Sequence, residues 1–262
     1  MPITFQSLRS GSSGNCLLVQ NGKTSLLIDA GFPSIRGSRE ALERVLPSVG
    51  AAVISHLHRD HVSYSALRVL EEHGVPVYVH RDAMESLAQR HFGGKPFDEL
   101  DLRPFTERRF RVGDFAVRPF EVPHYPGHAT FGFEVSCARR GRWRRLVVAT
   151  DFHDGASLRH WFEDADFIYV EANHDPELLE EHWNPNSLYH LSNGHCGRLL
   201  RDAFDHSHAV PPVVMLGHLS EDRNRPELAA ATVAGILEEA GYGAVELRVA
   251  PRSGPSRPIA IA

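Results

Sequence analysis

Short hydrophobic runs, alternating with polar positions or unbroken, divide the first half of the chain into a series of expected strands. Turn sequences separate the first three strands: a Ser- and Gly-rich segment at residues 10–15 and the pair Asn21-Gly22, which is typical of a hairpin. Four later runs have the spacing of antiparallel strands. We expect strands over residues 4–8, 16–20, 25–29, 51–55, 75–80, 108–112, 115–122, 131–138 and 144–150.

Other segments repeat their hydrophobic positions at helical spacing. The first is expected to begin at Ser38 as its N-cap and to end before Pro47, because proline cannot continue a helix. In the second half of the chain, helices and strands alternate. We expect helices over residues 39–46, 63–73, 81–90, 193–205 and 227–240, with further strands over 167–171, 213–217 and 245–250.

This order of elements predicts an α/β fold. Strands followed by helix–strand alternation, repeated once, indicate two halves that pack sheet to sheet with helices outside. The expected architecture is a four-layer αββα sandwich of two mixed sheets. We expect one domain over residues 1–250 and a loosely held C-terminal tail over residues 251–262.

Composition limits the classes of protein to consider. With 42% hydrophobic and 23% charged residues, the chain is typical of a globular protein, and no apolar run is long enough for a membrane span. The first residues lack the pattern of a signal peptide. Three separated cysteines favour a reducing compartment, so we expect the cytoplasm. The net charge of −5 means that nucleic-acid binding would need a local basic patch.

The strongest chemical signal follows the strand expected at 51–55, where the chain reads HxHxDH from His56 to His61. In an extended segment His56 and His58 face the same way and can bind one metal. The chain then turns, which directs Asp60 and His61 toward a neighbouring position. One metal takes only three or four protein ligands, so this crowding favours two metals about 3.5–4 Å apart. The alternative is a solvated histidine cluster.

The motif and its setting resemble the metallo-β-lactamase superfamily. Further motifs follow in the family's order at the ends of expected strands: Asp29, His124, Asp151 and His218. Each alone is weak evidence, because a single His or Asp after a strand is commonly a cap or an exposed residue. Together their order and spacing make the resemblance specific.

The resemblance implies the following roles. One metal takes His56, His58 and His124, the other takes Asp60, His61 and His218, and Asp151 bridges them. Asp29 supports the metal loop without being a ligand. Nitrogen and oxygen ligands suit zinc or manganese, with iron as a further option, so the cofactor is a pair of divalent ions. A metal-bridging water, ionised near neutral pH, would be the nucleophile.

Four blocks are similar to the YycJ-like exonuclease and phosphodiesterase branch: residues 10–15, 169–175, 189–193 and 218–222. Glu171 and His190 also resemble the relay of tRNA 3′-processing endonucleases, in which a carboxylate orients an imidazole that protonates the leaving oxygen. The resemblance implies catalytic roles for Asp60, Glu171 and His190. The alternatives are an Arg-paired carboxylate at the strand end and a histidine beside a helix cap. The chain departs from the branch at Tyr125, where an Asp usually follows the histidine.

Several residues are candidates for substrate contact. Ser12, Ser13 and Asn15 belong to a turn whose backbone N–H groups could bind phosphate, although a plain tight turn is equally consistent. His128 and Asn193 are further candidates. A basic run at residues 139–145 with one tryptophan could contact phosphates and bases, or could be a solvated turn.

We therefore expect a metal-dependent phosphodiesterase that acts as a 5′→3′ exonuclease on DNA or RNA ends. The 66 residues between Asp151 and His218 leave no room for the clamp domain of larger nucleases. The expected partner is nucleic acid, or a small phosphodiester, with no membrane and with the oligomeric state open. Two alternatives remain: a small-molecule hydrolase for a thioester, lactone or cyclic phosphodiester, and a module that has lost its metals.

Overall fold

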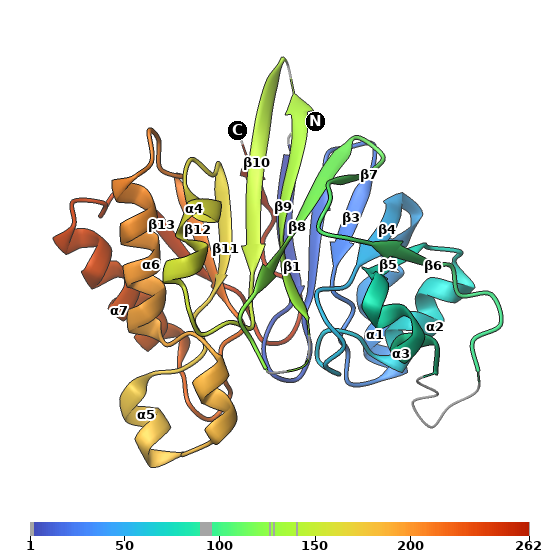
Figure 1. Ribbon diagram of the computed structural model, residues 1–262, viewed down its shortest axis with the longest axis horizontal. Helices are drawn as coiled ribbons and strands as arrows, with labels where there is room; N and C mark the ends of the chain where they lie inside the picture. Colours follow the sequence, from blue (N-terminus) through green and yellow to red (C-terminus); the bar gives the residue numbers. More distant parts are fainter. Residues whose placement is uncertain (1–2, 90–95, 126, 128, 140, 262) are drawn as a thin grey trace. The chain divides into compact units, whose positions relative to one another are not determined.

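The structure is a computed structural model that describes residues 3–89, 96–125, 127, 129–139 and 141–261. Two compact units divide the chain: Met1–Pro119 with Pro251–Ala262, and Phe120–Ala250. Figure 1 shows the order of helices and strands. Among the described residues, no helix combines the length and apolar character needed to span a membrane.

The first unit contains a seven-stranded sheet with the order β14-β1-β2-β3-β4-β5-β6. Neighbouring strands are antiparallel from β14 to β3 and parallel from β3 to β6, so the sheet is mixed. Its strands are β1 (Ile3–Arg9), β2 (Cys16–Gln20), β3 (Ser25–Ile28), β4 (Val49–Val53), β5 (Val77–His80), β6 (Leu102–Phe105) and β14 (Ile259–Ile261).

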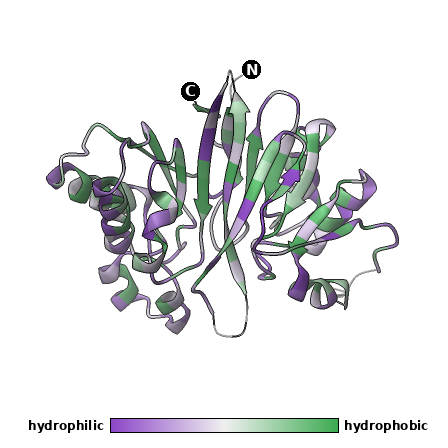
Figure 2. Cartoon of the chain, turned by 45° about the horizontal axis from the view of Figure 1, so that its top comes forward, coloured by the Kyte–Doolittle hydropathy of each residue, from purple (hydrophilic) through white to green (hydrophobic). Residues whose placement is uncertain are grey.

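Three helices pack on the first sheet: α1 (Ile35–Leu42), α2 (Tyr64–Glu72) and α3 (Met84–Gln89). Leu42 of α1 and Leu67 of α2 belong to one buried cluster with Leu27, Ile54 and Val79 of the sheet side. Figure 2 shows hydrophobic residues gathered on the strands and hydrophilic residues on the helix surfaces. The amphipathic pattern of these helices therefore explains why they pack on the first sheet.

The second sheet has the order β13-β12-β11-β10-β9-β8-β7, and β8 crosses the boundary between the two units. Strands β10 to β13 are parallel, whereas β9 with β10 and β7 with β8 are antiparallel. The strands are β7 (Phe110–Val112), β8 (Phe115–Val122), β9 (Thr130–Arg139), β10 (Arg142–Ala149), β11 (Phe167–Glu171), β12 (Val213–Gly217) and β13 (Glu246–Val249).

The helices of the second unit are α4 (Arg159–Phe162), α5 (Pro176–Glu181), α6 (Asn193–Asp205) and α7 (Pro226–Glu239). Phe162, Leu200 and Val233 bring α4, α6 and α7 into one buried cluster with the strands of this unit. Parallel neighbours place the carboxyl ends of β10, β11 and β12 at one edge of the sheet. That edge is where the candidate chemistry of this unit lies.

The first helix begins earlier than expected. Ser34, not Ser38, is its N-cap and accepts a hydrogen bond from the Gly37 N–H at 3.1 Å. Ser38 lies inside the helix, where its hydroxyl donates to the Ser34 carbonyl at 2.9 Å and contacts Ser65 Oγ. A glycine three residues into the helix hid this start, because glycine ordinarily argues against a helix interior.

The C-terminal residues differ from the loosely held tail that we expected. Ile259 and Ile261 are buried, and β14 forms the edge of the sheet by pairing with β1 through Phe5↔Ile259 and Ile3↔Ile261. The Ser256 N–H also donates to the Ser7 carbonyl at 2.7 Å. The three apolar residues Ile-Ala-Ile are too few to show a strand period in the sequence alone. Strand β6 and the short helices α4 and α5 were likewise not expected.

Candidate metal centre

The HxHxDH segment follows β4 and forms a tight loop in the first unit. His56 Nε2 and His58 Nδ1 lie 2.9 Å apart, and the His61 ring lies 4.3 Å from the His56 ring between centroids. The loop closes because the His61 N–H donates to the His58 carbonyl at 3.0 Å. Two nitrogens on one zinc at about 2.0–2.1 Å would be roughly 3.3 Å apart, so this pair nearly has the spacing of shared ligands.

Asp29 holds this loop from the end of β3. Its Oδ1 accepts the Ser55 N–H at 2.8 Å, and its Oδ2 accepts the Ser55 hydroxyl at 3.0 Å and lies 2.7 Å from His61 Nδ1. A carboxylate at Nδ1 fixes the proton there and leaves Nε2 as the electron-pair donor. The arrangement is the one expected of a support for a metal-binding histidine.

Asn15 is buried beneath the same loop. Its side-chain nitrogen lies 3.1 Å from His61 Nε2, and its Oδ1 accepts the Gly11 N–H at 2.9 Å. Its backbone N–H donates to the Asp60 carbonyl at 2.6 Å. Asn15 was expected among the substrate contacts, but these contacts make it part of the framework of the loop.

Two residues of this framework were missed at the level of sequence. Ser55 contacts both Asp29 and His56 Nδ1, the latter at 3.0 Å, so it orients the first histidine. Gly31 lies so close to the loop that a Cβ there would be 1.8 Å from the Asp60 carbonyl oxygen. The positions of Ser55 directly before His56 and of Gly31 two residues after Asp29 were the available signals.

In the second unit, polar residues gather where neighbouring strands end. Asp151 follows β10, Glu171 ends β11 and His218 follows β12. His218 Nε2 lies 3.7 Å from Asp151 Oδ2, and His124 Nε2 lies 3.7 Å from Asp151 Oδ1. These distances leave space between the donor atoms, as a shared cation would require.

Backbone strain marks the same positions. Asp29, Asp151 and His218 have φ values of 63°, 61° and 54°, and among the described residues only one other non-glycine residue, Asp164, has positive φ. Such conformations are unfavourable and persist where the surrounding structure imposes them, often at functional sites. Strain thus singles out three of the motif residues in both units.

Glu171 is fully buried and organises two imidazoles. Its Oε1 lies 2.7 Å from both His190 Nδ1 and His218 Nδ1, while Oε2 accepts the N–H groups of Phe152 and Leu191, each at 3.2 Å. Burial by itself would raise the pKa of Glu171, but the two imidazoles lower it to about 2. The partners of Glu171 are therefore histidines, where the alternative interpretation expected an arginine.

His190 lies two residues before the N-cap of the following helix, as the alternative expected, but its ring is oriented by Glu171. Burial alone would lower the pKa of His190, but the charge of Glu171 and the hydrogen bond to it raise that pKa above its usual value. The cap of α6 is Ser192, which accepts the His195 N–H. The His124 ring lies 5.1 Å from the His190 ring between centroids, and burial lowers the pKa of His124, which favours a neutral, metal-binding imidazole.

The second unit therefore contains a compact donor set. Asp151, Glu171, His190 and His218 each present one ligand atom, and these atoms lie within 4.8 Å of one another. Nitrogen and carboxylate oxygen donors suit zinc, manganese or iron. The residues in both units thus fit divalent metal ions by type and spacing.

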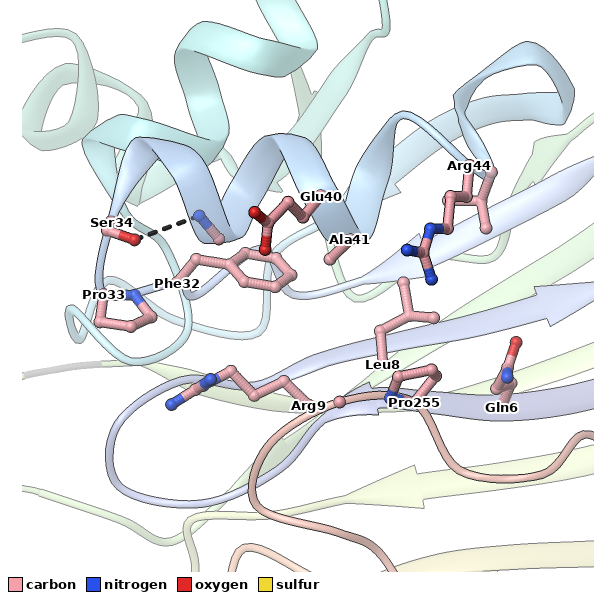
Figure 3. Close-up of a pocket in the computed structure, with 13 residues that line it drawn as sticks. Gln6, Leu8, Arg9, Phe32, Pro33, Ser34, Glu40, Ala41, Arg44 and Pro255 are labelled. Atoms are coloured by element: carbon pink, nitrogen blue, oxygen red, sulfur yellow. Dashed lines mark hydrogen bonds between the residues drawn. The ribbon is translucent and has the colours of Figure 1, made fainter.

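Two adjoining pockets lie in the first unit. One of about 600 Å³ is lined by Ser12, Ser13, Arg59 and Asp60, together with the N-caps of α1 and α2, Ser34 and Ser63. The other, of about 520 Å³, shares residues 32–34 with it. Figure 3 shows Leu8 and Phe32 of the second pocket with Arg9 and Arg44 on either side. In the first, the polar pocket, serine hydroxyls, one cation and one carboxylate lie beside apolar residues such as Phe32 and Ile35, next to the metal loop.

The remaining expected contacts fall elsewhere. Asn193 is buried at the start of α6, and its amide exchanges hydrogen bonds with that of Asn224 at 3.1 and 2.8 Å. His128 and Arg140 lie outside the described residues. In the basic turn, Arg144 pairs with Asp166 and Arg145 with Glu134, each at 2.8 Å. These two arginines therefore have structural partners.

The position of the basic turn also limits its role. Arg142 is the first residue of β10, and Asp151 follows the end of that strand. At a rise of about 3.3 Å per residue, Arg142 and Asp151 are about 30 Å apart. The turn cannot touch a phosphate that lies at Asp151.

Comparisons with known proteins add to this geometry. A family model described as "Beta-lactamase superfamily domain" matches residues 24–218. The exodeoxyribonuclease YycJ of Bacillus anthracis is 30% identical, covering 94% of this chain and 93% of that protein. The exodeoxyribonuclease WalJ of Streptococcus pneumoniae is 26% identical, covering 91% and 90%. The crystal structure of the metallo-beta-lactamase fold protein YhfI from Bacillus subtilis is similar with a TM-score of 0.73 at 18% identity, covering 98% and 99%.

Proposed function

Because this chain belongs to the metallo-β-lactamase superfamily, we propose that it is a metal-dependent phosphodiesterase acting as a 5′→3′ exonuclease on DNA or RNA ends. The fold class agrees with this family: two mixed seven-stranded sheets with flanking helices. The names of the two exodeoxyribonuclease relatives support a nucleic-acid substrate. The observation that carries the proposal is the contact of one buried carboxylate, Glu171, with both His190 and His218.

We assign the metal ligands as the family resemblance implies. One ion would take His56, His58 and His124, the other would take Asp60, His61 and His218, and Asp151 would be shared. The spacing of His56 and His58 within the first unit supports this assignment, as do the distances of 3.7 Å from Asp151 to His124 and to His218 within the second. When bound, two such ions supply an ionised water as nucleophile and stabilise developing negative charge.

The chain's own residues would complete the reaction. Ionised Glu171 holds a proton on His190 Nδ1, so the second proton of the charged imidazole is on Nε2. That Nε2–H would donate to the alkoxide oxygen as its bond to phosphorus breaks, leaving a neutral His190 for reprotonation from water. The same Glu171 oxygen orients His218 for metal binding. One carboxylate would therefore position both the proton donor and a metal ligand.

The polar pocket of the first unit would receive substrate phosphate. Arg59 contributes a positive charge, while Ser12 and Ser13 contribute hydroxyl donors. The N-termini of α1 and α2 reach the same pocket through Ser34 and Ser63, and helix N-termini attract anions. Asp60 lines the pocket as well, so phosphate here would be next to the metal loop.

A panel assay tests the proposal. Purified protein would be stripped of metal, reloaded with manganese or zinc, and offered 5′-labelled single- and double-stranded oligonucleotides, a thioester, a lactone and a cyclic phosphodiester. We expect metal-dependent release of nucleotides from the 5′ end and a steep loss of binding with salt. Hydrolysis of the small esters alone, insensitive to salt, would instead establish a small-molecule hydrolase.

A further inference from the structure

Two tyrosines stand directly beside the histidines of the second unit. Tyr125 follows His124 in the chain, and Tyr189 precedes His190. Their rings lie 4.8 Å apart between centroids at an interplanar angle of 63°, and the Tyr189 carbonyl lies 3.1 Å from His124 Nδ1. The tyrosine pair therefore lies next to the imidazoles that the proposed reaction would use.

One ring of this tyrosine pair is exposed to solvent, although it lies beside buried polar residues. Tyr125 is 44% exposed, although the neighbouring His124 and Asp151 are buried. An edge-to-face contact with half-buried Tyr189 fixes the first ring without covering it. An aromatic surface that is both held in place and open to solvent therefore adjoins a buried polar site.

We propose that Tyr125, held by Tyr189, is the stacking platform for a nucleobase next to the bond that is cleaved. This inference rests on the proposed nuclease function and names how the enzyme binds the strand end. A base is joined to its phosphate through a single sugar, so its binding surface must lie close to the reacting groups. Tyr125 meets this requirement because it is adjacent in sequence to a proposed metal ligand.

Stacking suits a nuclease without a clamp domain. Every base has a flat face, so one tyrosine can hold any nucleotide without reading its sequence. The polar pocket of the first unit provides charge and hydroxyl groups, and its aromatic lining consists of Phe32, which is buried, and Tyr64 at the start of α2. The tyrosine pair therefore supplies a type of contact that phosphate recognition alone does not.

The test pairs a protein change with a substrate change. Metal-loaded wild type, Tyr125→Ala, Tyr125→Leu and Tyr125→Phe would be assayed on oligonucleotides carrying a natural base or an abasic tetrahydrofuran at each of the first two nucleotides. For wild type we expect removal of one of these bases to lower kcat/KM about 5- to 100-fold. Tyr125→Ala and Tyr125→Leu should show a similar loss on the natural substrate and no further loss on the abasic one. Tyr125→Phe should resemble wild type.

A matched control is available in the same unit. Trp143 is 57% exposed and lies about 26 Å along β10 from Asp151, so Trp143→Ala removes an exposed aromatic ring far from the site. It should keep the full dependence on the base. Quenching of 2-aminopurine at the same nucleotides, in an oligonucleotide with phosphorothioate linkages, reports stacking without turnover and should be lost only in the Ala and Leu variants.

The outcomes separate this inference from the function on which it rests. Cleavage of oligonucleotides with the same base dependence in wild type and Tyr125→Ala would overturn the platform and leave the nuclease intact. A Tyr125→Phe variant as impaired as Tyr125→Ala would also overturn it, because the hydroxyl and not the ring would then matter. If the metal-loaded wild type neither binds nor cleaves any oligonucleotide, both proposals fail.

Discussion

Two buried carboxylates, one in each unit, contact histidines at the same distance but differ in how many imidazoles each contacts. Asp29 and Glu171 each lie 2.7 Å from the Nδ1 of a proposed metal ligand, His61 and His218 respectively. The other contacts of Asp29 are with Ser55, next to the metal loop, whereas Glu171 has a second imidazole, His190. One carboxylate therefore serves a single ligand, and the other joins a ligand to a proton donor.

This difference follows from how each site is built. The first unit draws its proposed ligands from one loop of six residues, so Asp29 can hold His61 directly and reach His56 through Ser55, its neighbour in the chain. The second unit draws its groups from the ends of separate strands, which must be connected through a side chain. We therefore expect substitutions in the second unit to have larger and more varied effects on the reaction than those in the first.

The largest effect is expected at Asp151, the proposed shared ligand. Asp151→Ala should bring turnover below detection, because both ions lose a ligand, and metal analysis should find fewer than two ions per chain. Asp166→Ala, which alters the contacts of Arg144 and Arg145 elsewhere in the unit, is the control and should keep both ions. Retained turnover with loss of only one ion would refute the shared role.

Glu171→Gln should have the next largest effect. The amide loses the negative charge that favours protonated His190 and orients His218, so kcat on oligonucleotides should fall about 100- to 10,000-fold. Metal affinity should fall about 10- to 100-fold in the same variant. Steady-state kinetics at several metal concentrations separate the two losses, because added metal can restore only the second. Full recovery with metal would make Glu171 equivalent to Asp29.

His190→Ala isolates the proton donor. An oligonucleotide has a poor leaving group that needs a proton, so kcat should fall about 100- to 10,000-fold, with metal content unchanged. Hydrolysis of bis-p-nitrophenyl phosphate, whose leaving group departs unprotonated, should change far less. His206→Ala, at the exposed C-terminal end of α6, provides the control. Equal losses on both substrates would contradict the assignment of His190 as the acid.

Asp29→Asn should affect metal binding and little else. It weakens the support of His61, so metal affinity should fall about 10- to 100-fold, and saturating metal should restore most of kcat. Titration with a chelating indicator gives the affinity, and kinetics at high metal give the remaining defect. A loss of kcat that metal cannot restore would show that the two carboxylates do not differ as proposed.

The two sites also differ in how far sequence could predict them. The loop of the first unit is a contiguous pattern, so its composition and spacing already indicated metal binding. In the second unit each residue was a single His or Asp after a strand, and only the family resemblance joined them. The dual contact of Glu171 and the burial of Asn15 and Asn193 depend on tertiary packing, which periodicity does not encode.

The prediction of secondary structure has the same limit, because periodicity does not encode tertiary contacts. Strands with a clear hydrophobic pattern, such as β8 and β11, were predicted to the residue. Strand β14 was not, because three residues carry too little periodicity and its order comes from the edge of β1. The start of α1 was predicted too late because Gly37, inside the helix, argued against a helix that begins after Ser34.

The smallest effect is expected at a carboxylate with no histidine partner. Glu71 accepts the N–H groups of Asp98 and Glu99 at 2.7 and 2.8 Å and pairs with Arg68. Burial would raise the pKa of Glu71, but these hydrogen bonds and the Arg68 charge lower it below its ordinary value of 4.5. Glu71→Gln should therefore cost about 1–2 kcal/mol of the free energy of unfolding at pH 7 and leave kcat unchanged.

The pH dependence of this difference has a defined sign. A lowered pKa in the folded state gives a stabilisation that is complete above pH 4.5 and disappears as the pH falls below it, because the unfolded chain then binds the proton first. Urea unfolding of wild type and Glu71→Gln should therefore converge as the pH is lowered from 7 toward 3. The neighbouring Glu72→Gln, which breaks an exposed pair with Arg39, should cost well under 1 kcal/mol at pH 7. If Glu71→Gln impaired catalysis instead, carboxylates without a histidine would also matter to the site, and the comparison of Asp29 with Glu171 would lose its basis.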